Sequence, residues 1–196
     1  MSKQVPQSEL GADSASYPGV SDSTVIVTGA SNGIGRATAA VLATNGATVY
    51  GLDLDASPSD GGPRFESLVD DGRLVVGDVT DRAIVEGLIE EAEGNGGLDA
   101  VVNNAGIPGN GTLEDVDPGA WQRTFDVHVN GTRNVCQAAL PALKNSDRGS
   151  IVNVSSIAAL GAYGGAADYA SAKAAIIGMT QQLSADYSPQ GVRVNA

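Results

Sequence analysis

The sequence predicts an α/β fold in which helices cover both faces of one doubly wound parallel sheet, a three-layer αβα arrangement. Two observations carry this prediction. From about residue 23 onward, short apolar runs of strand length alternate with segments whose apolar residues recur at helical spacing. The first run also passes directly into a glycine-rich turn and then a helix. Because strands that alternate with helices are joined by crossovers, the strands are expected to be parallel.

Composition limits the possible functions. With 196 residues, 42% of them hydrophobic, the chain is long enough to bury the core of one domain. The net charge of -12 opposes binding to nucleic acid or an anionic membrane, because both need a basic surface. The sequence has no apolar run of the ~20 residues that a membrane helix needs, and no signal-peptide pattern. We therefore expect a cytoplasmic protein with no nucleic-acid or membrane partner.

The single cysteine and the single histidine are both interpreted as structural. Cys136 lies in an apolar helical run without a partner for a disulfide, which is typical of a buried thiol. His128 lies between two valines. The spacing of metal ligands is absent, so no metal site is predicted.

The first strand, turn and helix predict a phosphate-binding site. Residues 1–22 lack periodicity and are predicted to be a disordered tail, so that the domain spans 23–196. Residues 24–27 form a strand, and the helix after the turn runs through about Ala43. Glycines let the backbone approach a pyrophosphate, and the helix N-terminus offers N–H groups to the anion. A plain strand-to-helix turn is the alternative. The candidate cofactor-binding residues of this turn are Thr28, Gly29, Ser31, Asn32, Gly33, Ile34 and Gly35.

The second strand, residues 47–52, ends at Asp53, about twenty residues beyond the turn. A carboxylate at this position accepts hydrogen bonds from ribose hydroxyls, and its charge repels a 2′-phosphate. Neither Asn32 nor Leu54 supplies a basic group for such a phosphate. The predicted cofactor is therefore NAD, with NADP disfavoured, although Asp53 as an ordinary loop carboxylate is the alternative.

The third and fourth strands add further cofactor contacts. Residues 73–77 form the third strand, and Asp78 and Val79 follow it. Asp78 is placed either to hydrogen-bond the adenine or to cap the helix that starts near residue 81. The fourth strand, 98–102, ends in Asn103, Asn104, Ala105 and Gly106. The small residues would leave room for the cofactor, and the asparagine side chains could tie neighbouring strand ends together.

The chemistry is expected between residues 150 and 173. A fifth strand, 151–154, leads to Ser155 and Ser156, and a Gly/Ala-rich loop then leads into a helix. Tyr169 and Lys173 are one turn apart on that helix, so they share a face. A neighbouring ammonium favours the phenolate, which would let Tyr169 exchange a proton with a carbonyl or alcohol oxygen while Ser156 holds that oxygen. An ordinary solvated helix pair is the alternative.

Two further segments complete the order of elements. A helix near 118–127 leads into a longer one with a glycine and Asn130 near its middle. Its amide could face inward and bind a water next to Lys173, or it could be a surface or kink residue. Residues 191–195 form a sixth strand.

These motifs together resemble the short-chain dehydrogenases/reductases in order and spacing. The residues that carry the resemblance are Thr28, Gly29, Gly33, Gly35, Asp78, Val79, Asn103 to Gly106, Asn130, Ser156, Tyr169, Lys173 and the strand Arg193-Val194-Asn195. The resemblance implies a Rossmann-type fold and NAD(P)-dependent interconversion of a secondary alcohol and a ketone by hydride transfer. It is nearest to 3-oxoacyl-carrier-protein reductases and to NAD-dependent secondary-alcohol, polyol and sugar dehydrogenases.

The resemblance also implies roles for four catalytic residues. Tyr169 would be the general acid/base, Ser156 would hold the substrate oxygen, and Lys173 would contact the nicotinamide ribose. Asn130 would anchor a proton relay. The family is usually dimeric or tetrameric through two long helices, here near 113–145 and 167–188.

Members of this family are longer than 196 residues, and the sequence ends just after the sixth strand. A substrate-covering segment and the family's last strand and helix would follow. We therefore expect a fragment or a truncated form with weak or no activity. The alternative function is a catalytically inactive nucleotide-binding or interaction protein.

Overall fold

The computed structural model describes residue 17 and residues 19–162 and 164–196. Most of the predicted tail lies outside this part of the chain. The six strands are β1 (Thr24–Thr28), β2 (Thr48–Asp53), β3 (Gly72–Val76), β4 (Ala100–Asn103), β5 (Ser150–Asn153) and β6 (Arg193–Asn195). They form one sheet in the order β3-β2-β1-β4-β5-β6, and every neighbouring pair is parallel. The predicted doubly wound sheet is thus confirmed.

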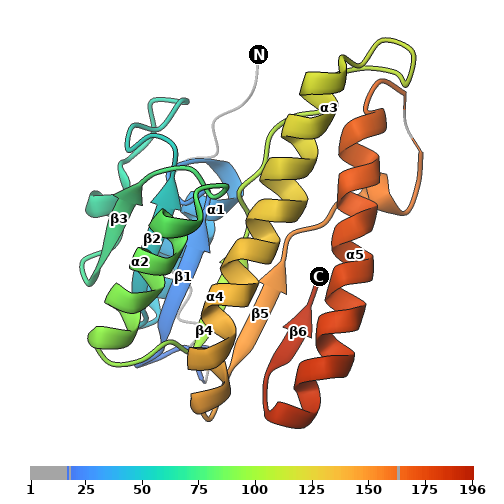
Figure 1. Ribbon diagram of the computed structural model, residues 1–196. Coiled ribbons are helices and arrows are strands. Elements are labelled where there is room, and N and C mark those ends of the chain that lie inside the picture. The colour runs from blue at the N-terminus through green and yellow to red at the C-terminus, as the bar shows by residue number, and fades with distance from the viewer. Residues whose placement is uncertain (1–16, 18, 163) are drawn as a thin grey trace.

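Helices cover both faces of the sheet (Figure 1). They are α1 (Gly33–Thr44), α2 (Arg82–Gly94), α3 (Pro118–Phe125), α4 (Gly131–Asn145) and α5 (Ala167–Tyr187). Short 3-10 turns lie at Phe65–Ser67, Ile157–Ala159 and Ser188–Gln190. In Figure 1, α2 and α4 lie in front of the sheet and α1 lies behind it. None of the helices in the described ranges is long and apolar enough to cross a membrane.

The two core layers follow from the period of two along each strand. In β1, all of whose residues are buried, Ile26 belongs to the core layer beneath α2 and α4. Val25 and Val27 belong to the opposite layer, where they pack with Ala39 of α1 and with Phe65. Because side chains alternate across a strand, a central strand buried on both faces is apolar throughout.

One predicted helix differs from a regular α-helix. Between α3 and α4 the chain makes a π-turn, Asp126–Asn130, in place of the continuous α-helix expected near residues 113–145. Gly131 follows the turn and packs closely against Val79, which lies shortly before α2. A Cβ atom on Gly131 would lie 2.7 Å from Val79 Cγ1. The π-turn changes which side chains of this segment face the sheet.

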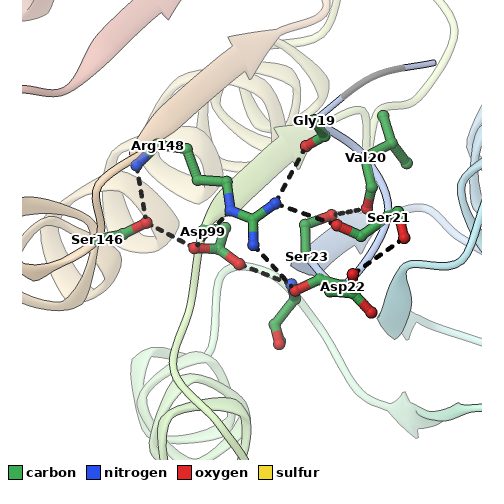
Figure 2. A network of polar contacts seen from close by, with 9 residues as sticks. Gly19, Val20, Ser21, Asp22, Ser23, Asp99, Ser146 and Arg148 are labelled. Atoms are coloured by element: carbon green, nitrogen blue, oxygen red, sulfur yellow. Dashed lines mark hydrogen bonds and ion pairs between the residues drawn. The ribbon is translucent and has the colours of Figure 1, made fainter.

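A polar network ties the chain before β1 to the start of β5 (Figure 2). The Arg148 guanidinium donates to the carbonyl oxygens of Ser21 and Asp22 at 3.1 and 3.2 Å. It also lies 3.7 Å from a carboxylate oxygen of Asp99, whose other oxygen accepts the backbone N–H of Thr24 at 3.0 Å. This network closes the amino-terminal edge of the sheet and leaves the carboxyl-terminal edge open for a site.

Candidate active site

Two cavities adjoin at the carboxyl-terminal edge of the sheet. One is lined by the glycine-rich turn, the ends of β2 and β3 and the segment after β4. The other is lined by the segment after β5 together with Tyr169 and Lys173. Ile34, Asn104 and Gly106 line both cavities, so one groove runs from the end of β2 to α5. Open α/β sheets bind ligands at this edge.

The glycine-rich turn has the geometry that the sequence predicted. Gly29 and Gly33 have φ angles of 67° and 49°, which favour glycine. A Cβ atom on Gly35 would lie 2.0 Å from the carbonyl oxygen of Gly29, so only glycine fits there. Asn32, the N-cap residue of α1, makes no side-chain hydrogen bond to the helix. Its side-chain oxygen instead accepts the backbone N–H of Ser59 at 2.7 Å. The first N–H groups of α1 therefore keep their capacity to bind an anion.

Ser31 and Asp53 join the turn to the end of β2. The backbone N–H of Ser31 donates to Asp53 Oδ2 at 2.8 Å. Ser31 is fully buried, and its hydroxyl has no hydrogen-bond partner among the described residues. Gly33 lines the cavity with open space above it, which leaves room for a bound polar ligand, whereas Ser31 lies beneath the cavity lining.

The only arginine of α1 does not offer a free charge at this end of the groove. The Arg36 guanidinium forms a bidentate pair with Asp60, at 2.7 and 2.8 Å. The exposed Asp60 carboxyl has its pKa lowered to about 2 by this hydrogen bonding and by the backbone N–H of Gly62. Asp53 lines the cavity itself. The polar end of the groove is thus acidic.

Asparagine side chains tie the strand ends together, as interpreted from the sequence. Asn104 Nδ2 donates to the carbonyl oxygen of Thr28 at 3.0 Å, and the Thr28 hydroxyl accepts the backbone N–H groups of Asn104 and Ala105, each at 3.0 Å. Asn103 Nδ2 donates to Asn153 Oδ1 at 2.8 Å. These bonds fix the relative positions of β1, β4 and β5 at the groove.

Asp78 does not cap α2, because that position belongs to Asp81. One oxygen of Asp78 accepts the backbone N–H of Thr80 at 2.9 Å, and the other pairs with Arg123 at 2.8 Å. Burial opposes ionisation, but these hydrogen bonds prevail and lower the pKa of Asp78. Asp78 and Val79 both line the first cavity.

Tyr169, Lys173 and Ser156 line the second cavity together. Lys173 Nζ lies 5.7 Å from the centroid of the Tyr169 ring and donates to the carbonyl oxygen of Val154 at 2.6 Å. Lys173 is 4% exposed, and burial lowers its pKa to about 8. Its ammonium is therefore poised to exchange a proton near neutral pH.

The two serines have different partners. The Ser155 hydroxyl donates to the carbonyl oxygen of Lys173 at 2.9 Å. Ser156 Oγ accepts the backbone N–H of Ala158 at 3.1 Å, which leaves its proton available to a ligand. This difference supports the choice of Ser156 for contact with a substrate oxygen.

The structure does not bring Asn130 into this group. Asn130 is exposed, and its amide donates to Asp126 Oδ1 at 2.7 Å. The reason is helical phase, since the buried positions from the π-turn onward recur as pairs spaced three and four residues apart. These pairs are 127 and 128, 131 and 132, and 135 and 136. Asn130 lies on the outer face with Arg133, so its side chain takes the surface position that was the alternative and does not face inward toward a water next to Lys173.

Two residues of the site were not predicted to take part. His128, interpreted as structural, lies in the second cavity with Tyr169 and Lys173. Its membership of the buried stripe is a sequence signal that could have placed it there. The other is Asp168, which is fully buried and accepts hydrogen bonds from Asn110 and Thr124. Nothing in the local sequence pairs Asp168 with those partners.

Comparisons with known proteins agree with this geometry. A family model described as short chain dehydrogenase matches residues 23–196. The 2-(S)-hydroxypropyl-CoM dehydrogenase 3 of Xanthobacter autotrophicus is 40% identical over 177 residues, covering 88% of this chain and 68% of that protein. The 3-oxoacyl-[acyl-carrier-protein] reductase of Thermotoga maritima is 35% identical, covering 87% of this chain and 70% of that protein.

A solved structure gives the same result for the fold. Carveol dehydrogenase from Mycobacterium avium, crystallised in complex with NAD, matches with a TM-score of 0.84 and 27% identity. The match covers 90% of this chain and 70% of that one. The chain thus spans about two thirds of the length of these proteins.

Proposed function

This chain belongs to the short-chain dehydrogenase family, and from that premise we propose that it interconverts a secondary alcohol and a ketone by NAD-dependent hydride transfer. The observation that carries the proposal is the single groove in which the glycine-rich turn adjoins Tyr169, Lys173 and Ser156. That arrangement favours catalysis over the alternative of an inactive nucleotide-binding protein, which needs only the first half of the groove.

The first half of the groove is the proposed site of the nucleotide. Gly33 to Gly35 and the α1 N-terminus would hold the pyrophosphate, since the backbone at Gly33 is open and the N–H groups of the helix lack a side-chain cap. Asp53, which lines the cavity, would hold the adenosine ribose, and Ser31 would position that carboxylate through its backbone N–H. Asp78 and Val79 would lie beside the adenine, and Asn104, Ala105 and Gly106 would line the path to the nicotinamide.

The second half is the proposed site of the chemistry. Bound NADH supplies the hydride for reduction of a ketone. Ser156 donates a hydrogen bond that orients the substrate oxygen, and Tyr169 gives that oxygen its proton. Lys173, whose pKa is lowered to about 8 by burial, faces the Tyr169 ring and replaces the proton from solvent. In the oxidation direction the same groups accept the proton.

The preference for NAD over NADP rests on two carboxylates. A 2′-phosphate would lie against Asp53, and like charges about 4 Å apart repel by about 4 kcal/mol at an effective dielectric constant of ~20. Arg36 is already paired with Asp60, at 2.7 Å, and so does not offset that repulsion. Carveol dehydrogenase, with NAD in its crystal structure, gives independent support.

The remaining parts of the proposal concern the cellular location, the assembly and the substrate of the protein. We also propose that the protein acts in the cytoplasm. A homo-oligomer formed through α4 and α5 is the proposed assembly, and the partner of the site is a small alcohol or ketone. Sedimentation of the purified chain would measure its mass in solution, and a monomer would contradict the assembly.

The experiment is a titration of the purified chain with NADH and NADPH, followed by cofactor fluorescence. NADH is expected to bind more tightly, and Asp53→Ala should reduce that preference. Asp70→Ala, which removes an exposed carboxylate elsewhere on the surface, is the matched control. Consumption of NADH with ethyl acetoacetate and cyclohexanone then tests the chemistry, and Tyr169→Phe should slow it about 100-fold or more. Failure of the chain to bind either cofactor would refute the proposal.

A further inference from the structure

The segment that follows β4 is fastened to the start of α5, directly beside Tyr169. The carbonyl oxygen of Gly111 accepts the backbone N–H of Ala167 at 3.0 Å. Gly109 fits so closely against the helix that a Cβ atom on it would lie 3.1 Å from Tyr169 Cβ. Residues 107–109 also line the second cavity. The segment therefore forms one wall of that cavity, next to the proposed acid/base.

Asp168 joins this wall to the helix. One oxygen of its carboxylate accepts the backbone N–H groups of Asn110 and Tyr169, at 3.2 and 2.8 Å. The other oxygen accepts the Asn110 side-chain amide at 2.7 Å and the Thr124 hydroxyl at 2.8 Å. A single side chain thus connects the cavity wall with the backbone of the proposed acid/base.

A buried carboxylate is a costly way to join two segments if stability is its only purpose. Asp168 and Thr124 are both fully buried, and the donors that the carboxylate accepts from are uncharged. A buried charge loses hydration that an apolar side chain of similar shape would not lose. Burial opposes ionisation, but the hydrogen bonds from Asn110 and Thr124 prevail and lower the pKa of Asp168 to about 2. What the ionised group adds is direction, since hydrogen bonds to a carboxylate are short and oriented.

We propose that Asp168 is a positioning residue for the reaction, which acts through Asn110 to fix the cavity wall of residues 107–110 relative to Tyr169. The inference rests on the proposed function. A substrate confined by this wall presents its oxygen to the phenol, and Asp168 itself neither touches the substrate nor exchanges a proton. A displacement of about 1 Å between reacting groups can cost about 100-fold in rate. Neither Asp168 nor Asn110 lines the first cavity, so the nucleotide half should not depend on this contact.

Exchange of the two polar side chains tests the contact directly. Asn110→Ala removes the side-chain donor, and Asn110→Asp sets a second carboxylate against Asp168. The double variant Asn110→Asp/Asp168→Asn restores the hydrogen bond with donor and acceptor reversed. Its new amide can also donate to the Thr124 hydroxyl, which in turn can donate to the carbonyl oxygen of Ala120, 3.0 Å away. Every donor of the network therefore keeps a partner in the double variant.

Each single Asn110 variant is expected to lose about tenfold or more in kcat for ketone reduction, with the dissociation constant for NADH changed less than about twofold. The double variant should return to within about threefold of the wild-type kcat, because the two side chains act as one unit. Asn95→Ala, which removes an exposed amide from the C-terminal end of α2, is the matched control and should keep the wild-type kcat. A double variant no more active than Asn110→Asp would overturn the proposal.

Hydrogen exchange measures the same contact without substrate or cofactor. The backbone N–H of Tyr169 lies in the first turn of α5, where helical N–H groups have no partner within the helix, and Asp168 accepts it. Its exchange should be about tenfold or more faster in Asn110→Asp than in the wild type, and should slow again in the double variant. Equal exchange rates in these three proteins would also overturn the proposal.

The measurements distinguish the failure of this inference from the failure of the proposed function. If the wild type binds NADH and reduces a ketone, and both single Asn110 variants are as active as the wild type, the role of Asp168 is refuted while the proposed function stands. If the wild type neither binds NADH nor reduces either ketone, the proposed function fails, and a role for Asp168 in that reaction fails with it.

Discussion

Replacement of Asp168 by alanine is expected both to destabilise the protein and to disturb the candidate active site. The fully buried carboxylate accepts four hydrogen bonds, two from Asn110 at 2.7 and 3.2 Å, one from the Thr124 hydroxyl at 2.8 Å and one from the backbone N–H of Tyr169 at 2.8 Å. It thus joins the loop after β4, the helix α3 and the first turn of α5 immediately before the proposed acid/base.

The magnitude follows from which donors are left unpaired. The Thr124 hydroxyl can donate to the carbonyl oxygen of Ala120, 3.0 Å away, and Asn110 is exposed enough to reach water. The backbone N–H of Tyr169 is the donor that loses most. An unsatisfied buried donor costs about 1–3 kcal/mol, which applies in full to the Tyr169 N–H and in part to the donors of Asn110 and Thr124. Asp168→Ala should therefore lower the free energy of unfolding by about 2–4 kcal/mol.

Asp168→Asn is the matched variant, since it keeps the shape and one acceptor oxygen. An amide nitrogen in place of the second oxygen can donate to the Thr124 hydroxyl but no longer accepts from Asn110, so this variant should lose about 2 kcal/mol at pH 7. Urea unfolding followed by circular dichroism measures both values. A loss for alanine no larger than that for asparagine would refute the reasoning.

The pH dependence gives an independent test. Burial alone would raise the pKa of Asp168, but the hydrogen bonds from Asn110 and Thr124 prevail and lower it to about 2, from an ordinary value of 3.8. A carboxyl whose pKa is lowered by folding stabilises the protein above the unfolded pKa, and loses that contribution as the pH falls toward the folded pKa. The difference corresponds to about 2 kcal/mol. The stability gap between the wild type and Asp168→Asn should therefore shrink between pH 4 and 2, and a constant gap would contradict this assignment.

Three further predictions concern the groove and the core. Gly35→Ala should abolish NADH binding, because its Cβ would lie 2.0 Å from the Gly29 carbonyl oxygen, whereas Gly87→Ala on an open surface should bind NADH normally; equal binding by both would contradict this. Burial lowers the pKa of Lys173 to about 8, below its ordinary 10.5. Between these two pH values the lysine is protonated in the unfolded chain and neutral in the folded protein. The stability of the wild type relative to Lys173→Met should thus rise with pH over that window, as urea unfolding would measure, and a flat difference would count against it. Cys136 is buried with its pKa raised to about 12 by burial, so a thiol reagent should label it only after unfolding, and rapid labelling of the native protein would disprove this.

Most of the fold and of the proposed nucleotide site could be predicted from local sequence patterns. The apolar runs predicted all six strands of the described sheet, with ends displaced by one or two residues. The turn residues Gly29, Gly33 and Gly35 are determined by backbone geometry within a few positions of the chain. Asp53 follows from the end of β2, and Tyr169 with Lys173 from one helical turn. In each case the relevant distance is short along the sequence.

Contacts between distant segments could not be obtained in this way. Asp168 meets Asn110 and Thr124 because the segment after β4 and the helix α3 both pack against α5, and Arg36 meets Asp60 although the rest of α1 and all of β2 lie between them in the sequence. The directions in which His128 and Asn130 point could not be predicted from local patterns either. A single π-turn sets the phase of the helix and turns the imidazole toward Lys173 and the amide toward solvent.

The sequence by itself therefore determined the parallel α/β fold, the glycine-rich turn and the Tyr169–Lys173 pair. Each depends on backbone preferences and periodicities that act over one turn or one strand. Only the tertiary structure decided that His128 rather than Asn130 faces the groove, and that Ser155 is committed to a backbone carbonyl while Ser156 is available. Those choices depend on which side chains the packing of separate elements brings within hydrogen-bonding distance, and no local pattern encodes that packing.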